Sequence, residues 1–436
     1  MTPPPRQRIA IVGAGISGAG AAFALHPHHD VTVYEREPRP GGHSHTVDVD
    51  YDGVRIAVDT GFIVYNGLNY PNLTALFDHL GVVTKATEMS FGLSLDQGAF
   101  EWSGKTLGAL FAQRRNLLAL SYLWMLREVV RFNKLCVADK AAGALVGLSL
   151  GAWLDKRRFA RRFREDYLAP MAAAIWSTPA AHVLDFPAES FVAFFANHRL
   201  INYERPIWRT VEGGSRSYVE KLNAPLRDRL RLGAPVASVT RDDLGVTVTD
   251  AAGDAQRFDQ VILASHSDES LALLADAGDA ERAVLGAIRY RPNDVWLHRD
   301  ARLMPKRKAV WSAWNYLGSR TDPAVAARDV AVTYWMNELQ GIDPERPLFV
   351  TLNPPFEPDP ALTFARFRYD HPQYDAEALA AQRRLPEIQG KRRTWFCGAW
   401  TGFGFHEDGL SSGLAVADAL GAAPPWRAPS FAEAAE

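Results

Sequence analysis

Closely spaced glycines directly after a short apolar run constrain the fold of this chain more than any other feature. The run RIAIV, residues 8–12, is typical of a buried strand, and GAGISG follows it at once. Residues 19–25 favour a helix, and the alternating run VTVY at residues 31–34 predicts a second strand. Strand, glycine turn, helix and strand in this order predict a right-handed βαβ unit of a parallel sheet.

The glycine spacing is that of a dinucleotide-binding fingerprint. Gly13 permits the tight turn, Gly15 lets backbone amides approach a pyrophosphate, and Gly18 lets the helix pack close to the strand. The N-terminus of that helix faces the phosphates. Glu35 stands at the end of the second strand, where an acid accepts hydrogen bonds from a ribose 2′-hydroxyl. An acid at this position favours FAD or NAD over NADP.

A second glycine pair, Gly41 and Gly42, follows shortly after this acid. It offers more bare backbone to the same pyrophosphate, which suits a flavin dinucleotide better than a nicotinamide one. Far along the chain, a strand-like run ends at Gly398, and the segment GFHEDGL, residues 404–410, precedes a helix. We expect the N-terminus of that helix to lie against the pyrimidine edge of an isoalloxazine and to stabilise its reduced form.

The composition limits the remaining functions. A length of 436 residues corresponds to two or three domains at about 150 residues each. The net charge of −2 provides no field that would attract nucleic acid. The two cysteines, Cys136 and Cys397, exclude a disulfide framework and a thiolate metal site, and no histidine pair has metal-ligand spacing. We therefore expect no metal site and no nucleic-acid partner.

Helix-like and strand-like stretches follow one another in long blocks. Residues 105–200 are rich in Leu, Ala and Arg and predict helices, whereas residues 285–370 predict strands broken by Pro and Gly. We expect a nucleotide-binding domain of three segments, with a second domain inserted twice. The FAD-binding domain comprises residues 1–66, 205–282 and 388–425, the substrate domain residues 67–204 and 283–387, and the tail residues 426–436.

Longer motifs run along the whole chain, namely GAGISG, YEREPRPGGH, DTGF, GAPVASV and FCGAW followed by HEDGLSSG. This set resembles the amine-oxidase superfamily of FAD proteins, which includes monoamine oxidases, protoporphyrinogen oxidase and phytoene desaturases. The runs GFIVYN, NHRL, LMPKRK, WSAWNY, VTYWMNELQ and GFHEDGLSSG are similar to a bacterial branch encoded beside cyclopropane-fatty-acid synthases. Members of that branch include a desaturase of methyl-branched acyl chains on the route to furan fatty acids.

The resemblance implies an α/β fold, in which a Rossmann-type FAD-binding domain similar to that of glutathione reductase carries a mixed α+β substrate domain, as in amine oxidases. It implies that Ser17 and the glycines of the turn hold the pyrophosphate and that Glu35 holds the adenosine ribose. The other FAD-binding positions that it implies are Gly41 and Gly42 near the phosphates, Gly61 beside the flavin, Val236 at the adenine, Gly398 at the pyrophosphate, and Gly409 with Leu410 at the flavin O2 edge.

The chain departs from the family pattern at informative places. His43, a further FAD-binding position, stands where many relatives carry an arginine on the phosphate. Amine oxidases place a lysine under the flavin N5, whereas the matching strand, residues 290–298, contains no lysine, which argues against an amine as the substrate. Cys397 does not lie where monoamine oxidases bond their flavin, so we expect FAD to be bound non-covalently.

His406, Glu407 and Asp408 are candidate groups for proton transfer. His406 is the best poised near neutral pH to accept a proton close to the flavin, and Glu407 is the second candidate for a catalytic role. The alternative is that Glu407 and Asp408 cap the helix and hold the loop before it.

The resemblance implies dehydrogenation of a lipid acyl chain, with a methyl-branched unsaturated acyl group on phospholipid as the expected substrate. A hydride would leave an activated allylic carbon for flavin N5 while a base takes the neighbouring proton, which gives a second, conjugated double bond. The alternatives are a flavin amine oxidase, a redox-neutral flavin isomerase and a non-catalytic partner of a lipid methyltransferase. The fold alone does not choose among them.

Two segments of the sequence indicate where in the cell the protein is expected. Residues 1–8 lack the apolar stretch of a secretory signal, so we expect a cytoplasmic protein. The run KRRFARRFR, residues 156–164, contains the cations Arg157, Arg158, Arg161 and Arg162. On a helix these arginines would bind the anionic inner face of the cell membrane, and the alternative is a solvated helix whose phenylalanines face the core.

A third segment is the most hydrophobic window of the later chain, residues 117–126. It covers about half of a bilayer, so we expect no transmembrane helix. A buried helix is the favoured interpretation and a membrane-dipping element the alternative.

Overall fold

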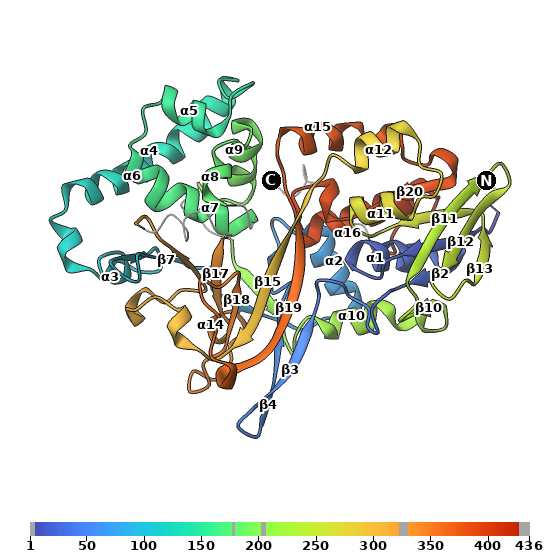
Figure 1. The fold of residues 1–436 in the computed structure, drawn as a ribbon, viewed down its shortest axis with the longest axis horizontal. Helices are drawn as coiled ribbons and strands as arrows, with labels where there is room; N and C mark the ends of the chain where they lie inside the picture. The colour runs from blue at the N-terminus through green and yellow to red at the C-terminus, as the bar shows by residue number, and fades with distance from the viewer. Residues whose placement is uncertain (1–4, 177–178, 202–205, 322–329, 427–436) are drawn as a thin grey trace.

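The structure is a computed structural model that describes residues 5–176, 179–201, 206–321 and 330–426. The chain folds into two lobes (Figure 1). One lobe is built around a five-stranded parallel sheet, and the other around a seven-stranded mixed sheet with a group of helices beside it. The hairpin of β3 (Thr46–Tyr51) and β4 (Val54–Asp59) projects at the bottom of Figure 1.

The parallel sheet has the strand order β10-β2-β1-β14-β20, and every pairing in it is parallel. Its strands are β1 (Arg8–Val12), β2 (Asp30–Tyr34), β10 (Leu230–Arg231), β14 (Gln260–Leu263) and β20 (Thr394–Phe396). Parallel sheets are covered on both faces, so their strands read as nearly continuous apolar runs. This explains why RIAIV lacks polar alternation and confirms the predicted α/β class.

Successive residues of β1 pack into two different cores. Ile9 and Ile11 lie in the core that contains α1 (Ile16–Leu25) and α16 (His406–Ala419). Ala10 and Val12 lie in the core on the opposite face. That face is covered by β11 (Val236–Asp242), β12 (Gly245–Asp250), β13 (Ala255–Phe258), α11 (Ser267–Leu273) and α12 (Asp279–Leu285).

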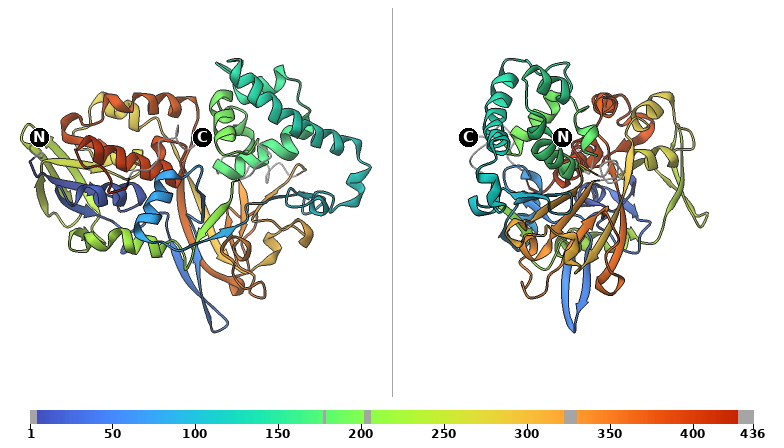
Figure 2. Two further views of the ribbon diagram at one scale, coloured as in Figure 1. Left: turned by 180° about the vertical axis from the view of Figure 1, so that it is seen from behind. Right: turned by 60° about the vertical axis from the view of Figure 1, so that its left-hand side comes forward.

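The mixed sheet has the order β19-β15-β18-β17-β16-β7-β8, and only β7 and β16 pair in parallel. Its strands are β7 (Phe91–Leu95), β8 (Phe100–Ser103), β15 (Tyr290–His298), β16 (Trp314–Gly318), β17 (Ala331–Trp335), β18 (Phe349–Leu352) and β19 (Thr363–Pro372). The edge strand β19 and its neighbour β15 stand closest to the parallel-sheet lobe (Figures 1 and 2). A small sheet joins β5 (Val64–Asn66), β9 (Trp208–Val211) and β6 (Thr84–Thr87).

One stretch supplies the helices beside the mixed sheet: α3 (Leu107–Leu110), η1 (Arg114–Leu117), α4 (Leu120–Ala141), α5 (Leu150–Lys156), α6 (Arg161–Phe163), η2 (Arg164–Leu168), α7 (Ala169–Trp176), α8 (Ala180–Val183) and α9 (Ala188–Asn197). The remaining helices longer than one turn are α2 (Pro71–Leu80), α10 (Arg216–Asn223), η3 (Ala224–Arg229), α14 (Met336–Gln340) and α15 (Ala376–Arg384). Within the described ranges, no helix combines the length and the apolar character that crossing a bilayer requires.

The expectation of one helix through residues 156–164 is wrong. α5 ends at Lys156, Arg158 adopts a left-handed φ of 53°, and α6 begins only at Arg161. The two phenylalanines are nevertheless both buried, because Phe159 and Phe163 stack with their ring centroids 4.9 Å apart. The chain turns here to bring both rings into the helical core.

Candidate functional site

A cavity of about 1070 Å³ lies between the two lobes. One end, which we call the dinucleotide end, lies at the carboxyl edge of the parallel sheet and is lined by Val12, Tyr34, Glu35, Ala264 and Gly398. Ligands of open parallel sheets bind at this edge. The other end, which we call the apolar end, is lined by side chains from β7, β16, β17, α7 and α9.

The glycine turn leaves open space at one position. Gly15 lines the cavity, and a Cβ atom there would meet no atom within 4 Å. A Cβ on Gly13, where φ is +104°, would lie 2.9 Å from the carbonyl oxygen of Ala264, and one on Gly18 would overlap the carbonyl oxygen of Gly13. Gly18 therefore brings α1 against β1 and does not line the cavity, whereas Ser17 does.

The second glycine pair lies against the first turn. The Gly41 N–H donates to the carbonyl oxygen of Ala14 at 2.8 Å, and a Cβ on Gly42 would lie 3.2 Å from the Cα of Gly15. Both residues of the pair have a positive φ, +110° and +55°, which glycine adopts without strain. The two turns together form a cradle of bare backbone.

Arg39 supplies a positive charge beside this cradle, a role that the sequence analysis missed. Its guanidinium donates to the carbonyl oxygen of Gly42 at 3.1 Å and lines the cavity. His43 also lines the cavity, but burial and the neighbouring His371, His266 and Arg39 lower its pKa well below the usual range. The imidazole of His43 is therefore neutral at neutral pH, whereas Arg39 offers a positive charge near the expected phosphates.

Glu35 lies at the end of β2, lines the cavity and is only 7% exposed. Its Oε2 accepts a hydrogen bond from the Ala14 N–H at 2.8 Å, and its Oε1 accepts one from the Glu37 N–H at 2.9 Å. Each oxygen keeps a lone pair for a ribose hydroxyl. Val236 lines the same end of the cavity. The bare cradle, the arginine and the fixed carboxylate fit a flavin dinucleotide.

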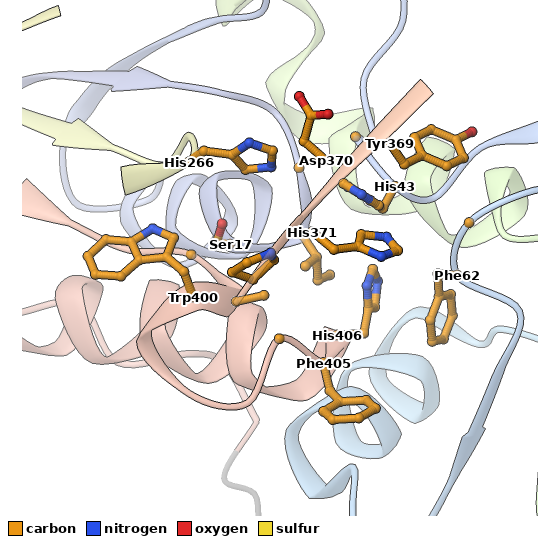
Figure 3. Close-up of a pocket in the computed structure, with 18 of the residues that line it drawn as sticks. Ser17, His43, Phe62, His266, Tyr369, Asp370, His371, Trp400, Phe405 and His406 are labelled. Atoms are coloured by element: carbon orange, nitrogen blue, oxygen red, sulfur yellow. The ribbon is translucent and has the colours of Figure 1, made fainter. Parts of the chain in front are cut away.

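Gly61, Phe62 and His406 also line the cavity, and Figure 3 shows Phe62 beside His406. A Cβ on Gly61 would overlap the carbonyl oxygen of His43, so only glycine allows this close approach of the two segments. The Phe62 ring stacks on the imidazole of His406, with centroids 4.0 Å apart and planes 13° from parallel. Figure 3 shows the rings of His43, His371 and His406 directed into the same space.

His406 is hydrogen-bonded through one ring nitrogen. Its Nε2 lies 2.6 Å from the Tyr218 hydroxyl and 3.3 Å from the Ser44 Oγ, and these two oxygens are 2.5 Å apart. The Nδ1 atom has no hydrogen-bond partner in the described part of the chain. Burial lowers the pKa of His406 to about 3, so the ring is neutral at neutral pH. In the tautomer that donates from Nε2 to Tyr218, Nδ1 is free to accept a proton.

Glu407 does not line the cavity, so the expected catalytic role has no support in its position. Its carboxylate accepts hydrogen bonds from the N–H groups of Asn72 and Leu73, both at 2.9 Å. These donors lie in the first turn of α2, where a carboxylate satisfies free N–H groups and opposes the helix dipole. The capping alternative thus describes Glu407, although the capped helix is α2 and not its own helix.

Asp408 holds the loop before α16. Its Oδ2 accepts hydrogen bonds from the N–H groups of Phe403 at 3.0 Å and Phe405 at 2.9 Å. Burial raises the pKa of Asp408 to about 6. The position agrees with the loop-holding alternative for this acid.

Of the three remaining positions expected to bind FAD, one lines the cavity and two do not. Gly398 follows β20 and lines the cavity. A Cβ on Gly409 would lie 3.0 Å from the Cγ2 of Ile16, and Leu410 is fully buried against Gly20. Neither Gly409 nor Leu410 lines the cavity, because this side of α16 packs on α1. The structure therefore does not bring these two residues to the expected flavin edge.

β19 contributes cavity residues that the sequence analysis missed. Tyr369 and His371 both line the cavity, and the Tyr369 hydroxyl lies 2.8 Å from the Thr60 Oγ1 and 2.9 Å from the His45 Nδ1. Tyr369 and Thr60 are 309 positions apart in the sequence. No local pattern signals such a contact, because it depends on the pairing of β19 with β15.

The two cysteines lie away from the cavity wall. Cys136 is buried in α4, and Cys397 is buried at the end of β20. Burial raises the pKa of the Cys397 thiol to about 12, so it stays protonated. Among the described residues, no group of three or more His, Cys, Asp and Glu is placed to hold a metal ion.

Aromatic and aliphatic side chains wall the apolar end: Met89, Phe91, Met171, Ile175, Phe194, Leu200, Trp208, Trp314 and Tyr334. No lysine lines the cavity within the described residues. The acids and arginines that line it come from other elements, mainly the loops after β2 and the strand β19. The apolar end therefore offers surroundings suited to a hydrocarbon.

Residues 16–301 match the family described as flavin containing amine oxidoreductase. In Mycobacterium tuberculosis (strain H37Rv), a protein named as a flavin-containing monoamine oxidase, AofH, is 28% identical over 266 residues. That match covers 58% of this chain and 56% of the relative, so the chain matches little more than half of the relative's length.

Solved structures share the fold over nearly the whole chain. Putrescine oxidase bound to putrescine has a TM-score of 0.66 at 17% identity, covering 95% of this chain and 99% of that one. A fatty acid isomerase from P. acnes has a TM-score of 0.65 at 16% identity, covering 95% and 98%. The parallel sheet, the backbone cradle and the match over residues 16–301 agree, and this chain belongs to the flavin containing amine oxidoreductase family.

Proposed function

We propose that this flavin-dependent oxidoreductase introduces a double bond into a lipid acyl chain, with a methyl-branched unsaturated acyl group on phospholipid as its substrate. The apolar end of the cavity carries this proposal, because its described walls are mainly apolar and aromatic, with Ser90 and His198 beside them, and hold neither lysine nor carboxylate. A hydrocarbon chain gains about 0.8 kcal/mol for each methylene buried in such surroundings. An ammonium group would lose its hydration there without an acid to pair with it.

FAD bound without a covalent link is the cofactor that we propose. The cradle of Gly15 and Gly42 would hold its pyrophosphate beside Arg39, and Glu35 would hold its ribose. The absence of both cysteines from the cavity wall supports non-covalent binding. When bound, the flavin supplies an acceptor for a hydride.

The chain's own part is to hold the acyl group, exclude water and accept a proton. Desaturation removes a hydride from an allylic carbon and a proton from its neighbour, whose C–H electrons become the new π bond. We assign the proton to Nδ1 of His406, whose other ring nitrogen is held by Tyr218 and Ser44. A pKa of about 3 makes this imidazole a weak base, and negative charge placed beside it raises that pKa.

Amine oxidation is the second candidate, because the apolar end is rich in aromatic rings, among them Trp208, Trp314 and Tyr334. The faces of such rings attract cations by about 0.5–2 kcal/mol. The relative in M. tuberculosis is named as a monoamine oxidase. Isomerisation without net oxidation is a third outcome to test, since a fatty acid isomerase shares the fold.

The deciding experiment is anaerobic mixing of the flavin-loaded protein with phospholipids that carry methyl-branched unsaturated acyl chains. Loss of the visible absorbance of oxidised flavin, with a product lighter by two hydrogens, is the expected result. Loss of absorbance with amines alone would establish the second candidate. Conversion of the lipid without a change in mass, only with reduced flavin, would identify an isomerase. A flavin that neither substrate reduces, in a protein that co-purifies with a lipid methyltransferase, would favour a non-catalytic partner.

A further inference from the structure

We propose that the outer face of α4, with the turn before it, binds the surface of an anionic lipid bilayer. We call this surface the α3–α4 face and define it by its exposed apolar side chains: Leu107, Leu117, Leu118, Leu120, Leu123, Trp124, Val130 and Val137. Leu118 and Leu120 are 88% and 82% exposed. Single exposed apolar residues are common on proteins, but a group of this size on neighbouring elements marks a contact surface.

Most of the exposed residues of α4 lie in one stripe along the helix. Leu120, Leu123, Trp124, Arg127, Val130, Lys134 and Val137 are exposed and follow one another at steps of three or four, apart from the adjacent pair Leu123 and Trp124. The opposite side of the helix packs in the core through Tyr122, Met125, Phe132 and Cys136. A surface helix normally has one apolar side. α4 has a second apolar side, which is exposed. The helix itself lies at the outer edge of the helical group (Figures 1 and 2).

The acids of α4 lie apart from its exposed cations. Arg127 and Lys134 lie in the exposed stripe, and neither forms an ion pair with an acid of the described chain. The Arg127 guanidinium lies over the Trp124 ring, 4.6 Å from its centroid. Both acids of the helix, Glu128 and Asp139, are 2% and 3% exposed on the inner side, where each pairs with an arginine. The outer stripe is therefore apolar and cationic.

This chemistry fits an anionic bilayer better than an acidic protein. Interfacial helices place aliphatic side chains among the acyl chains, while indole rings and the long stems of basic residues reach the headgroups. Clusters of basic residues beside such side chains bind acidic lipids. Arg114 and Arg115, exposed in η1, extend the basic rim. The proposal does not depend on the proposed function, although it would bring the chain to a source of phospholipid.

Three of the four arginines that the sequence singled out for membrane binding are already engaged. Arg157, Arg161 and Arg162 each form an ion pair with an acid of the chain. Arg162 also lies over the Phe100 ring, 4.9 Å from its centroid. We therefore propose the stripe on α4, and not these arginines, as the membrane contact.

Sedimentation of the full chain with lipid vesicles tests the α3–α4 face. We expect binding to vesicles of phosphatidylcholine with phosphatidylglycerol, and weaker binding to phosphatidylcholine alone. The variants Leu118→Ser/Leu120→Ser and Arg127→Glu/Lys134→Glu should each lower the bound fraction about tenfold. Leu244→Ser is the matched control, because Leu244 is 84% exposed in the β11–β12 turn of the other lobe. Unchanged thermal unfolding of the variants shows that they are folded.

Several results would overturn the proposal. One is failure of the chain to sediment with the anionic vesicles, and another is equal sedimentation of the wild type and both α4 variants. Loss of binding only on charge reversal of Arg158 and Arg161 would place the contact elsewhere. Self-association that the leucine variant abolishes, without any vesicle binding, would make the face a protein interface. None of these readouts involves turnover, so they stand apart from the test of the lipid desaturase.

Discussion

The hydroxyl oxygen of Tyr218 lies 2.6 Å from the Nε2 of His406, which joins α10 to the first residue of α16 beside the cavity. Burial raises the pKa of Tyr218 above its usual range and lowers that of His406 to about 3. Both groups are therefore neutral at neutral pH. A neutral, hydrogen-bonded pair fixes the orientation of the imidazole without placing a charge at the cavity wall.

Removal of the Tyr218 hydroxyl tests this pair. Tyr218→Phe should retain flavin but slow its reduction by lipid about 100-fold, because the imidazole loses the partner that holds its tautomer. The rate is measured per bound flavin by stopped-flow absorbance. Tyr316→Phe is the matched control, since Tyr316 does not line the cavity. An unchanged rate in Tyr218→Phe would contradict the assignment.

Two glycines of one turn should respond differently to the same added methyl group. In Gly15→Ala the added methyl group would meet no atom within 4 Å, so the flavin-free protein should keep its unfolding temperature. The same methyl group would occupy the space of the pyrophosphate, so the affinity for flavin should fall at least about tenfold. Gly18→Ala overlaps the carbonyl oxygen of Gly13, so it should lower the free energy of unfolding by about 1–3 kcal/mol. Flavin titration and calorimetry separate the two effects. Equal loss of stability in both variants would count against the open space at Gly15.

Glu407 and His406 are neighbours with separable roles. Glu407→Gln removes one of the acceptors at the start of α2 and should lower the free energy of unfolding by about 1–3 kcal/mol. The rate of flavin reduction per bound flavin should not change. His406→Gln should show the reverse pattern, with a slower rate and a smaller loss of stability. A slower rate in Glu407→Gln at unchanged stability would restore the catalytic role of this acid.

A larger side chain at the apolar end should block the substrate and spare the cofactor. Ile175→Trp fills space in that end of the cavity, far along the chain from the glycine turn. We expect flavin content to be unchanged and reduction by lipid to fall at least about tenfold. Leu244→Trp, in the exposed turn between β11 and β12, is the control for the added ring. Full activity in Ile175→Trp would mean that the substrate binds elsewhere.

Buried histidines should make the protein less stable in acid. Burial lowers the pKa of His298 to about 4, whereas an unfolded histidine titrates near 6.5. The unfolded chain therefore binds more protons below pH 6.5, so the free energy of unfolding falls as the pH drops towards 4. The loss is about 1.4 kcal/mol per pH unit for each such group.

A variant of His298 measures the contribution of one buried histidine to the pH dependence of the free energy of unfolding. His298 lies outside the cavity wall, and its Nε2 is 2.7 Å from the Thr351 Oγ1. Urea unfolding between pH 6.5 and 4.5 should show a shallower slope in His298→Asn than in the wild type. The two proteins must be compared because Asp408, with its pKa raised to about 6, has the opposite effect and stabilises the fold as the pH falls. This effect is the same in both proteins and cancels in the difference between their slopes. Identical slopes would contradict the prediction.

The sequence by itself determined the βαβ unit, the glycine cradle and the acid at the end of β2. These features depend on neighbouring residues, because the turn at Gly13, the helix after it and the strand that ends before Glu35 follow one another within the chain. Local conformational preference and strand burial are enough to predict them. The resemblance to the family also predicted a flavin cofactor, and it singled out Gly61, which lines the cavity.

Only the tertiary structure decided which distant side chains meet. Glu407 binds Asn72 at the start of α2, 335 positions away in the sequence, and Tyr369 reaches Thr60, 309 positions away. The packing of α16 on α1 turns Leu410 away from the cavity, and the packing of the helices beside the mixed sheet leaves Leu120 and Leu123 of α4 exposed. Such contacts depend on how complete elements pack against one another, and the residues on either side of each position do not encode that arrangement.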